Sequence, residues 1–235
     1  MNTRPSRLPF WVRRTHKWLS LVVGIQAVLW VLGGLYMVVV PLTKVHGDHL
    51  ASGERAPLTA SAARLDPDVL AARHPGMTGF TYKMLGGREV VEVRQGKQAT
   101  LLDAASGAPL GRLDRAQVEA LARAAYTGEG RIRAIEWLDR TPHEAGSRPA
   151  PLWAVHFDDA VATTLYYSPV SGELLTRRSA LWRWFDFAWM LHIMDYEERE
   201  DINNGLLQAS SLLAFVLSAS GAWLLVLWLR RRFRR

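Results

Sequence analysis

The chain has 235 residues, 49% of them hydrophobic, with 29 Lys and Arg against 22 Asp and Glu, and it contains no cysteine. The absence of cysteine excludes disulfides, thiolate metal sites and the thioether attachment of c-type haem. The net charge of +7 does not indicate a nucleic-acid partner, because the excess of basic residues lies in the two terminal tails.

The first apolar stretch, Leu19–Val40, is a run of about 22 residues without charge, which as a helix spans the roughly 30 Å hydrocarbon core of a bilayer. A second charge-free stretch covers residues 206–229. We therefore predict transmembrane helices at 18–41 and 206–229. A cleaved signal peptide is the alternative for the first stretch, but its apolar core would be shorter and a small-x-small site should follow it. The sequence VVVPLTKVHG follows instead, so an uncleaved anchor is predicted.

Basic residues flank both apolar stretches. They are Arg4, Arg7, Arg13, Arg14 and Lys17 before the first, and Arg230, Arg231, Arg232, Arg234 and Arg235 after the second. The positive-inside rule then predicts that the tails 1–17 and 230–235 are cytoplasmic and that residues 42–180 are periplasmic, in a bacterial inner membrane. Contact with anionic headgroups accounts for the basic tails, so membrane lipids are expected partners and nucleic acid is not.

The middle of the chain, between the two apolar stretches, has the residue pattern of an ordinary globular domain. Residues 58–73 predict a short helix, interrupted by Pro67 and ended by the sequence HPG. Strand-like runs follow at 80–85, 89–94 and 99–103, joined by Gly86-Gly87 and by residues 95–97, which are both hairpin signals. A turn at 104–107 leads to a last short strand at 109–112.

The same order then recurs. Residues 113–126 have apolar side chains at helical spacing, and strand-like runs follow at 131–138, 152–157 and 162–167, with residues 139–151 as an exposed loop. The sequence TLLDAASGAPLGR (100–112) is similar to TLYYSPVSGELLTR (164–177). We predict an α+β fold of two units, about 58–112 and 113–177, in which one helix covers one face of an antiparallel meander.

Residues 181–205 form a juxtamembrane segment rich in aromatic and acidic side chains. It opens with LWRWFDFAWMLHIMDY, and tryptophans this dense beside a membrane span predict an interfacial belt. His192 lies within the belt. The acidic residues that follow are interpreted as a solvated charge run.

A family resemblance follows from these motifs. A helix followed by an antiparallel meander that ends in S-G-E-L-L resembles the PepSY domain, here in two copies. The stretch HKWLSLVVGIQAVLWVLGGLYM (16–37) resembles the H-R-W-L-G-L first helix of PepSY-associated transmembrane proteins. The stretch FDFAWMLHIMDYEEREDINNGLL (185–207) resembles their entry into the next helix. The resemblance covers nearly the whole chain, although those relatives have four membrane helices and this chain has two predicted spans.

Proteins with this helix pair include inner-membrane haem b proteins that reduce ferric siderophores. The resemblance therefore implies haem b with His16 and His192 as axial ligands, and a ferric siderophore as the acceptor of electrons. These histidines flank the first span on opposite sides, so one chain cannot place both on one iron. An outer haem needs His192 with His46, His49 or the His192 of a second chain, and an inner haem needs two His16. A homodimer or a larger membrane complex is expected.

Two residues of the first span are further candidates for the cofactor site. Gln26 is costly in hydrocarbon unless it is paired, so it is expected to face the other helix or the cofactor. Trp30 at mid-span is a candidate for stacking on the macrocycle.

The exit from the first span suggests a metal site, since His46, Asp48 and His49 have a spacing that suits a hard or borderline metal. No nucleophile–base set, phosphate loop or nicotinamide motif is present, so no catalytic residue is predicted. Two other functions stay open. One is a non-enzymatic, membrane-tethered binding or regulatory module, and the other is a structural subunit of a membrane complex.

Overall fold

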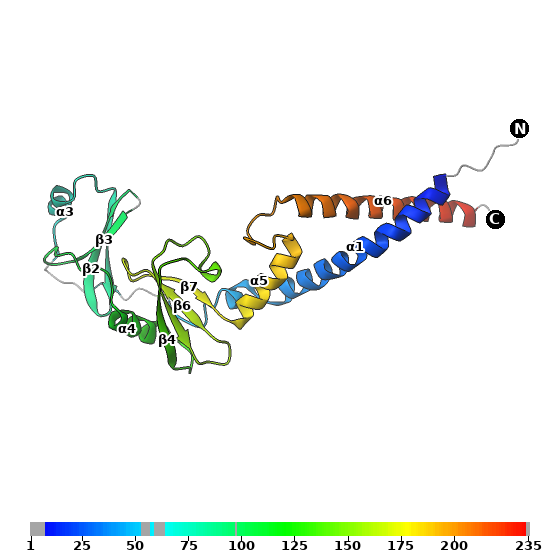
Figure 1. Ribbon diagram of the computed structural model, residues 1–235. Coiled ribbons are helices and arrows are strands. Elements are labelled where there is room, and N and C mark those ends of the chain that lie inside the picture. The colour runs from blue at the N-terminus through cyan, green and yellow to red at the C-terminus, as the bar shows by residue number, and fades with distance from the viewer. Residues whose placement is uncertain (1–7, 53–56, 59–63, 97, 234–235) are drawn as a thin grey trace, which may run out of the picture. The chain divides into compact units, whose positions relative to one another are not determined.

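The computed structural model describes residues 8–52, 57–58, 64–96 and 98–233. The chain divides into two compact units, Met1–Pro41 with Trp184–Arg235, and Leu42–Arg183. The first unit is helical and the second is α+β (Figure 1), which confirms the predicted class of a sheet-containing region flanked by two long apolar helices. The outermost residues of both predicted tails, and residues 59–63 of the helix predicted at 58–73, lie outside the described residues.

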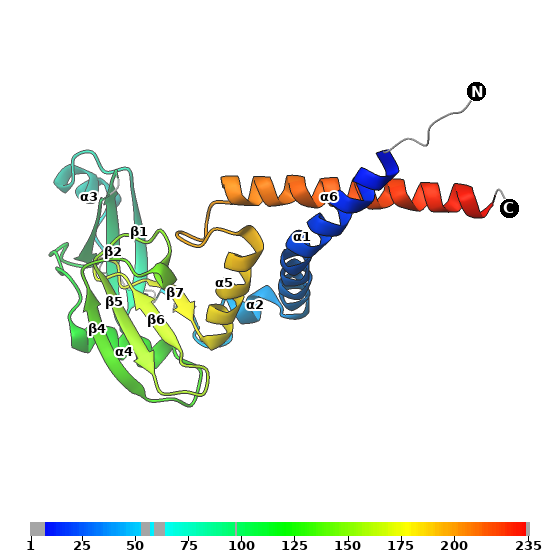
Figure 2. The same cartoon turned by 45° about the vertical axis from the view of Figure 1, so that its right-hand side comes forward.

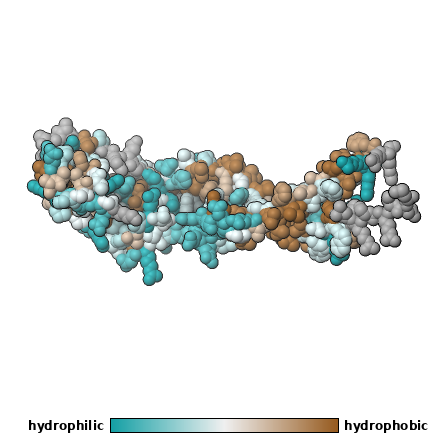
Figure 3. Space-filling view, turned by 90° about the horizontal axis from the view of Figure 1, so that it is seen from above, coloured by the Kyte–Doolittle hydropathy of each residue, from teal (hydrophilic) through white to brown (hydrophobic). Residues whose placement is uncertain are grey.

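The helical unit is built on α1 (Leu8–Val39) and α6 (Gly205–Arg232), which have 32 and 28 residues. Both are long and apolar enough to cross a bilayer, over Phe10–Val39 and Gly205–Arg232, as expected of a membrane protein. Apolar side chains are exposed along them, and Figure 3 shows hydrophobic surface over these helices. The two helices cross one another (Figure 2). The first helix begins well before the predicted span, so the basic residues Arg13, Arg14 and Lys17 are helical.

The predicted aromatic belt is a helix, α5 (Ala180–Ile193), whose later residues lie along the second half of α1. The rings of Phe185 and Tyr36 are 6.3 Å apart. Further along, a Cβ at Gly33 would lie 3.6 Å from the carbonyl oxygen of Ala188, so the two backbones approach closely there. The aromatic side chains of this segment therefore help to pack α5 on α1, which the sequence pattern alone did not predict.

The α+β unit starts with α2 (Leu42–Val45) and then forms its first sheet under α3 (Pro67–Arg73). The strands β1 (Gly79–Leu85), β2 (Arg88–Gln95) and β3 (Gln98–Asp103) are an antiparallel meander. Gly86 and Gly87 both have positive φ, as the tight turn between β1 and β2 requires. Pro67 begins α3 instead of interrupting a longer helix, because Asp66 caps it and proline is favoured in the first turn.

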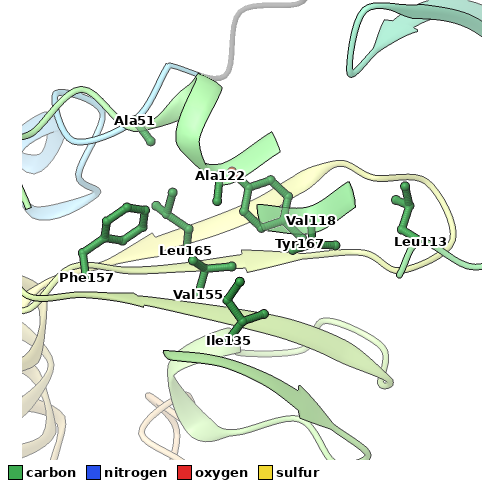
Figure 4. Packing of buried hydrophobic residues seen from close by; sticks show 9 residues of the cluster. All are labelled: Ala51, Leu113, Val118, Ala122, Ile135, Val155, Phe157, Leu165 and Tyr167. Atoms are coloured by element: carbon green, nitrogen blue, oxygen red, sulfur yellow. The ribbon is translucent and has the colours of Figure 1, made fainter. Parts of the chain in front are cut away.

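The second sheet contains β4 (Ile132–Leu138), β5 (Leu152–Phe157), β6 (Thr164–Tyr167) and β7 (Leu174–Arg178) in antiparallel order, with η1 (His143–Ala145) between β4 and β5. The helix α4 (Arg115–Ala125) begins with a capping box between Asp114 and Gln117. It covers one face of this sheet and closes the main core (Figure 4). The buried residues of that core are Ala51, Leu113, Val118, Ala122, Ile135, Val155, Phe157, Leu165 and Tyr167.

The turns after β3 and β6 have the same hydrogen-bond pattern. The Asp103 carboxylate accepts from the amides two and three residues ahead, and the Ser168 hydroxyl does the same. Gly107 donates its amide to the Asp103 carbonyl, and Gly172 donates to the Ser168 carbonyl. This pattern supports the internal repeat, although the strand predicted at 109–112 is reduced to one bridge, from Leu102 to the residue that opens it. The PepSY assignment itself stays a prediction.

Candidate functional site

The end of α5 is held by two side chains of α1. A helix leaves its last carbonyls without intrahelical partners. Gln26 Nε2 donates to the Leu191 carbonyl at 3.0 Å, and Trp30 Nε1 donates to the His192 carbonyl at 2.9 Å. The two donors are four residues apart, so they lie on one face of α1. Gln26 was expected to face a helix or a cofactor and Trp30 to stack on a macrocycle, and in the structure both donate to the backbone that carries His192.

The ring of His192 lies beside this face. Its centroid is 6.5 Å from that of Trp30. Its Nδ1 atom is buried and has no hydrogen-bond partner among the described residues. Native proteins pair almost all buried polar atoms, and an exception calls for an explanation such as backbone or side-chain strain, a redox role, or a bound water or ion. The nitrogen of His192 is therefore the strongest local indication of a site in this unit.

His16 lies near the start of α1, against the middle of α6. Its Nδ1 is 2.7 Å from Ser220 Oγ, and that hydroxyl donates its only proton to the Leu217 carbonyl at 2.8 Å. Ser220 therefore accepts from Nδ1–H, which leaves the lone pair on Nε2. A Cβ at Gly221 would lie 3.0 Å from the His16 ring, so α6 has glycine where the imidazole approaches it.

The two histidines belong to separate sites. His192 lies at the level of Trp30, within the apolar stretch Phe10–Val39 and not beyond its outer end as the sequence predicted. His16 precedes Trp30 by fourteen residues, or about 21 Å along the helix axis. Iron–nitrogen bonds are about a tenth of that length, so one chain cannot bring both imidazoles to one iron.

The loop after α5 organises part of the acidic run. The Asp195 carboxylate accepts hydrogen bonds from the backbone amides of Glu197, Glu198, Glu200 and Asp201. These hydrogen bonds lower the pKa of Asp195, and the one from the Asp201 amide has the largest effect. Asp195 is thus a structural acceptor for its own loop.

Two further polar residues tie this loop to the helices. Arg199 forms an ion pair with Asp186 of α5, and its carbonyl accepts from Trp189 Nε1 at 3.1 Å. Asn204 donates from Nδ2 to the Ile193 carbonyl at 2.9 Å and caps α6 by accepting from Leu207 N at 2.8 Å. Sequence reasoning missed these roles. The signal for Asn204 was local, since asparagine before a helix is a favoured N-cap.

The proposed metal residues His46, Asp48 and His49 follow α2 in the α+β unit, and all three are exposed. Asp48 Oδ1 lies 3.7 Å from Arg177 Nη1, so its nearest charged partner is a guanidinium. Within residues 8–52, 57–58, 64–96 and 98–233, no group of three or more His, Asp or Glu residues is placed to hold a metal. The metal hypothesis stays a prediction without support from the geometry.

The α+β unit contains a cleft of about 630 Å³ beside α4. Its walls come from the β1–β2 turn, the second half of α4 and the β6–β7 turn. The cationic residues Lys83 and Arg177 and the acidic residue Glu173 line it, together with Tyr167. No function was expected of these residues from the sequence.

Comparison with protein-family models, with curated proteins and with solved structures finds no match to this chain.

Proposed function

We propose that this chain is a haem b protein of the bacterial inner membrane that acts as a homodimer and passes electrons across the bilayer to ferric iron or a ferric siderophore. The observation that carries the proposal is the buried Nδ1 of His192, which has no hydrogen-bond partner among the residues that the structure describes. The acceptor rests on the resemblance of residues 16–37 and 185–207 to PepSY-associated transmembrane proteins.

The residues of the helical unit suit a haem held without thioether bonds. His16 presents a lone pair on Nε2, because Ser220 engages the opposite nitrogen. The Nδ1 of His192 has no hydrogen-bond partner in the described part of the chain, and the backbone of this residue is held by Gln26 and Trp30. Haem bound at these positions would supply one-electron redox chemistry, with potentials set by its ligands and surroundings.

The membrane orientation follows from charge. Arg13, Arg14 and Lys17 of α1 and Arg230–Arg232 of α6 are at the end of the helix pair where α1 begins and α6 ends (Figure 1). Cytoplasmic placement of that end satisfies the positive-inside rule and leaves residues 42–183 in the periplasm. His16 is then the inner ligand and His192 the outer one.

A dimer completes each site. The described part of the helical unit has one imidazole near the start of α1, that of His16, and one at the level of Trp30, that of His192. These two levels are about 21 Å apart along α1. A two-fold axis along the membrane normal pairs each residue with its own copy. Two His192 side chains would ligate one haem and two His16 side chains the other, and Gln26 and Trp30 would act as positioning residues for the outer pair.

Haem content per chain tests the proposal. We expect about one haem per chain in the purified dimer and half of that in His192→Ala or His16→Ala, since each variant removes one bis-imidazole site. His156→Ala is the matched control, because His156 lies in β5 and contacts Thr164. Full haem content in both single variants would refute the ligand assignment.

A tethered binding module is the second candidate, and the cleft beside α4 is the observation that favours it. In that case the two long helices only anchor the α+β unit. Activity would then survive His16→Ala and His192→Ala and fail on substitution of the cleft residues.

A further inference from the structure

The first sheet of the α+β unit has a cavity on the face that does not pack on α3. Val91 and Leu102 belong to the face that contacts Leu70 of α3. Neighbouring residues of a strand point to opposite faces, so Val90 and Leu101 belong to the other face. A cavity of about 190 Å³ lies between this other face and α4.

The walls of this cavity are mainly aliphatic. They include the side chains of Leu85, Leu110, Ala120 and Leu121, with the buried side chains of Val90 and Leu101. The three leucines at 85, 110 and 121 are half-buried, so they keep surface that a ligand can reach. Cavities lined by aliphatic side chains exclude water and take up apolar molecules, and one of about 150 Å³ is large enough for benzene.

Two polar side chains among the described residues also line the cavity, and both have partners. Arg88 donates from Nε and Nη2 to Asp103 Oδ2 at 3.0 and 2.7 Å. Gln117 accepts from the Asp114 amide at 2.9 Å in the capping box of α4. The charge of Arg88 is therefore balanced. An uncharged aliphatic group suits this cavity better than an ion.

The cavity adjoins the larger cleft beside α4, with which it shares four residues of β1, the turn after it and α4. The charged side chains of that cleft have both signs. Lys83 is paired with Glu92 at 2.6 Å. Arg177 lies 3.7 Å from Asp48, and Glu173 adds a carboxylate to the same cleft. The cleft favours neither an anion nor a cation, so a ligand that extends from the cavity into it needs an uncharged polar head.

We propose that the cavity binds the end of a neutral alkyl chain, and that the polar head of the same ligand lies in the adjoining cleft. A methylene group is close in size to a water molecule, which occupies roughly 30 Å³ in the liquid, so the cavity holds about six carbons. The proposal goes beyond the haem function and does not depend on it, because the cavity lies wholly in the α+β unit.

The test uses the full chain, labelled at its leucine methyl groups, in lipid nanodiscs, with straight-chain alcohols from butanol to decanol as probes. Equilibrium dialysis fixes the aqueous concentration of each alcohol, so uptake by the bilayer does not distort the titration. The methyl signals of Leu110 and Leu121 should shift saturably. Each methylene buried strengthens binding about fourfold, so hexanol should bind about 16-fold more tightly than butanol. Decanol should bind less than about fourfold more tightly than octanol, because its added carbons lie outside the cavity.

Ala120→Phe and Ala124→Phe are a matched pair of variants. Both alanines are exposed on α4 and line the cleft, but of the two only Ala120 lines the cavity. Ala120→Phe should weaken hexanol at least about tenfold, since its ring takes the place of several methylene groups at about fourfold each. Ala124→Phe should leave the affinity unchanged. Equal affinity in the two variants, methyl shifts that never saturate, or an affinity that rises steadily up to decanol would each overturn the proposal.

A lipid that carries a spin label at the end of its acyl chain separates the two sources of an alkyl chain. Broadening of the Leu110 and Leu121 methyl signals in nanodiscs of this lipid would assign the cavity to a bilayer lipid, and sharp signals would assign it to a free amphiphile. Haem content measured on the same samples keeps this outcome separate from that of the helical unit.

Discussion

Asn204 joins the end of α5 to the start of α6, and its substitution tests that junction. Its side chain donates to the carbonyls of Ile193 and Asp201 and accepts from Leu207 N. An N-cap is worth about 1 kcal/mol, and each hydrogen bond to a carbonyl adds about 0.5–1 kcal/mol. Asn204→Ala should therefore destabilise the junction by about 2–3 kcal/mol, or roughly 30- to 150-fold in its opening equilibrium.

Hydrogen–deuterium exchange of the chain in detergent measures this opening. Asn204→Ala should speed exchange both at the end of α5 and in the first turn of α6. Asn204→Asp keeps the cap on Leu207 but loses the donor to the carbonyls of Ile193 and Asp201, so the end of α5 should exchange faster while the first turn of α6 does not. Asn203→Ala is the control, because Asn203 is exposed. Wild-type exchange in Asn204→Ala, or equal acceleration in Asn203→Ala, would refute the reasoning.

Three further predictions concern the α+β unit. Lys83→Met should lower its unfolding free energy by about 3 kcal/mol, because Glu92 then stays buried with one cation fewer, and Lys83→Met with Glu92→Leu should recover most of the loss. Burial raises the pKa of Glu92, but hydrogen bonds from Lys83 and then Arg94 outweigh it and hold the pKa below 4.5. The stability from this carboxylate is thus present above pH 4.5 and lost as the pH falls below it. Chemical denaturation should therefore show that the unfolding free energy falls more steeply below pH 4.5 in the wild type than in the double variant. Gly172→Ala should lower the unfolding temperature more than Gly87→Ala, because both have positive φ but only Gly172 lacks room for a Cβ; equal shifts would contradict this.

Local signals account for the parts of the fold that could be predicted. Gly86-Gly87 between two alternating strands indicates a tight hairpin, and the structure has it, with Leu85 opposite Arg88. The role of Pro67 was predicted wrongly, because proline breaks a helix in its interior but is favoured in its first turn. The preceding aspartate caps α3, which indicates that the helix begins at Pro67. The strand expected at 109–112 is limited to the bridge at Pro109, because Gly111 has a positive φ and takes the backbone out of the extended region two residues later.

The candidate site was less predictable because its contacts are non-local. The sequence marks His16 and His192 and shows that Gln26 needs a partner, but not which atom that partner is. The pairing depends on α5 lying along the second half of α1, and neither helix encodes that alone. The burial of Tyr167 could not be predicted for the same reason, since it follows from the packing of α4 on the second sheet.

The most direct test of the account is an absorbance spectrum of the full chain, purified in detergent from haem-replete cells, before and after dithionite. The account predicts a Soret band that sharpens on reduction, with b-type α and β bands that lose about half their intensity in His192→Ala. A chain that is well folded by circular dichroism and yet shows no Soret band would contradict the account and leave the tethered binding module in its place.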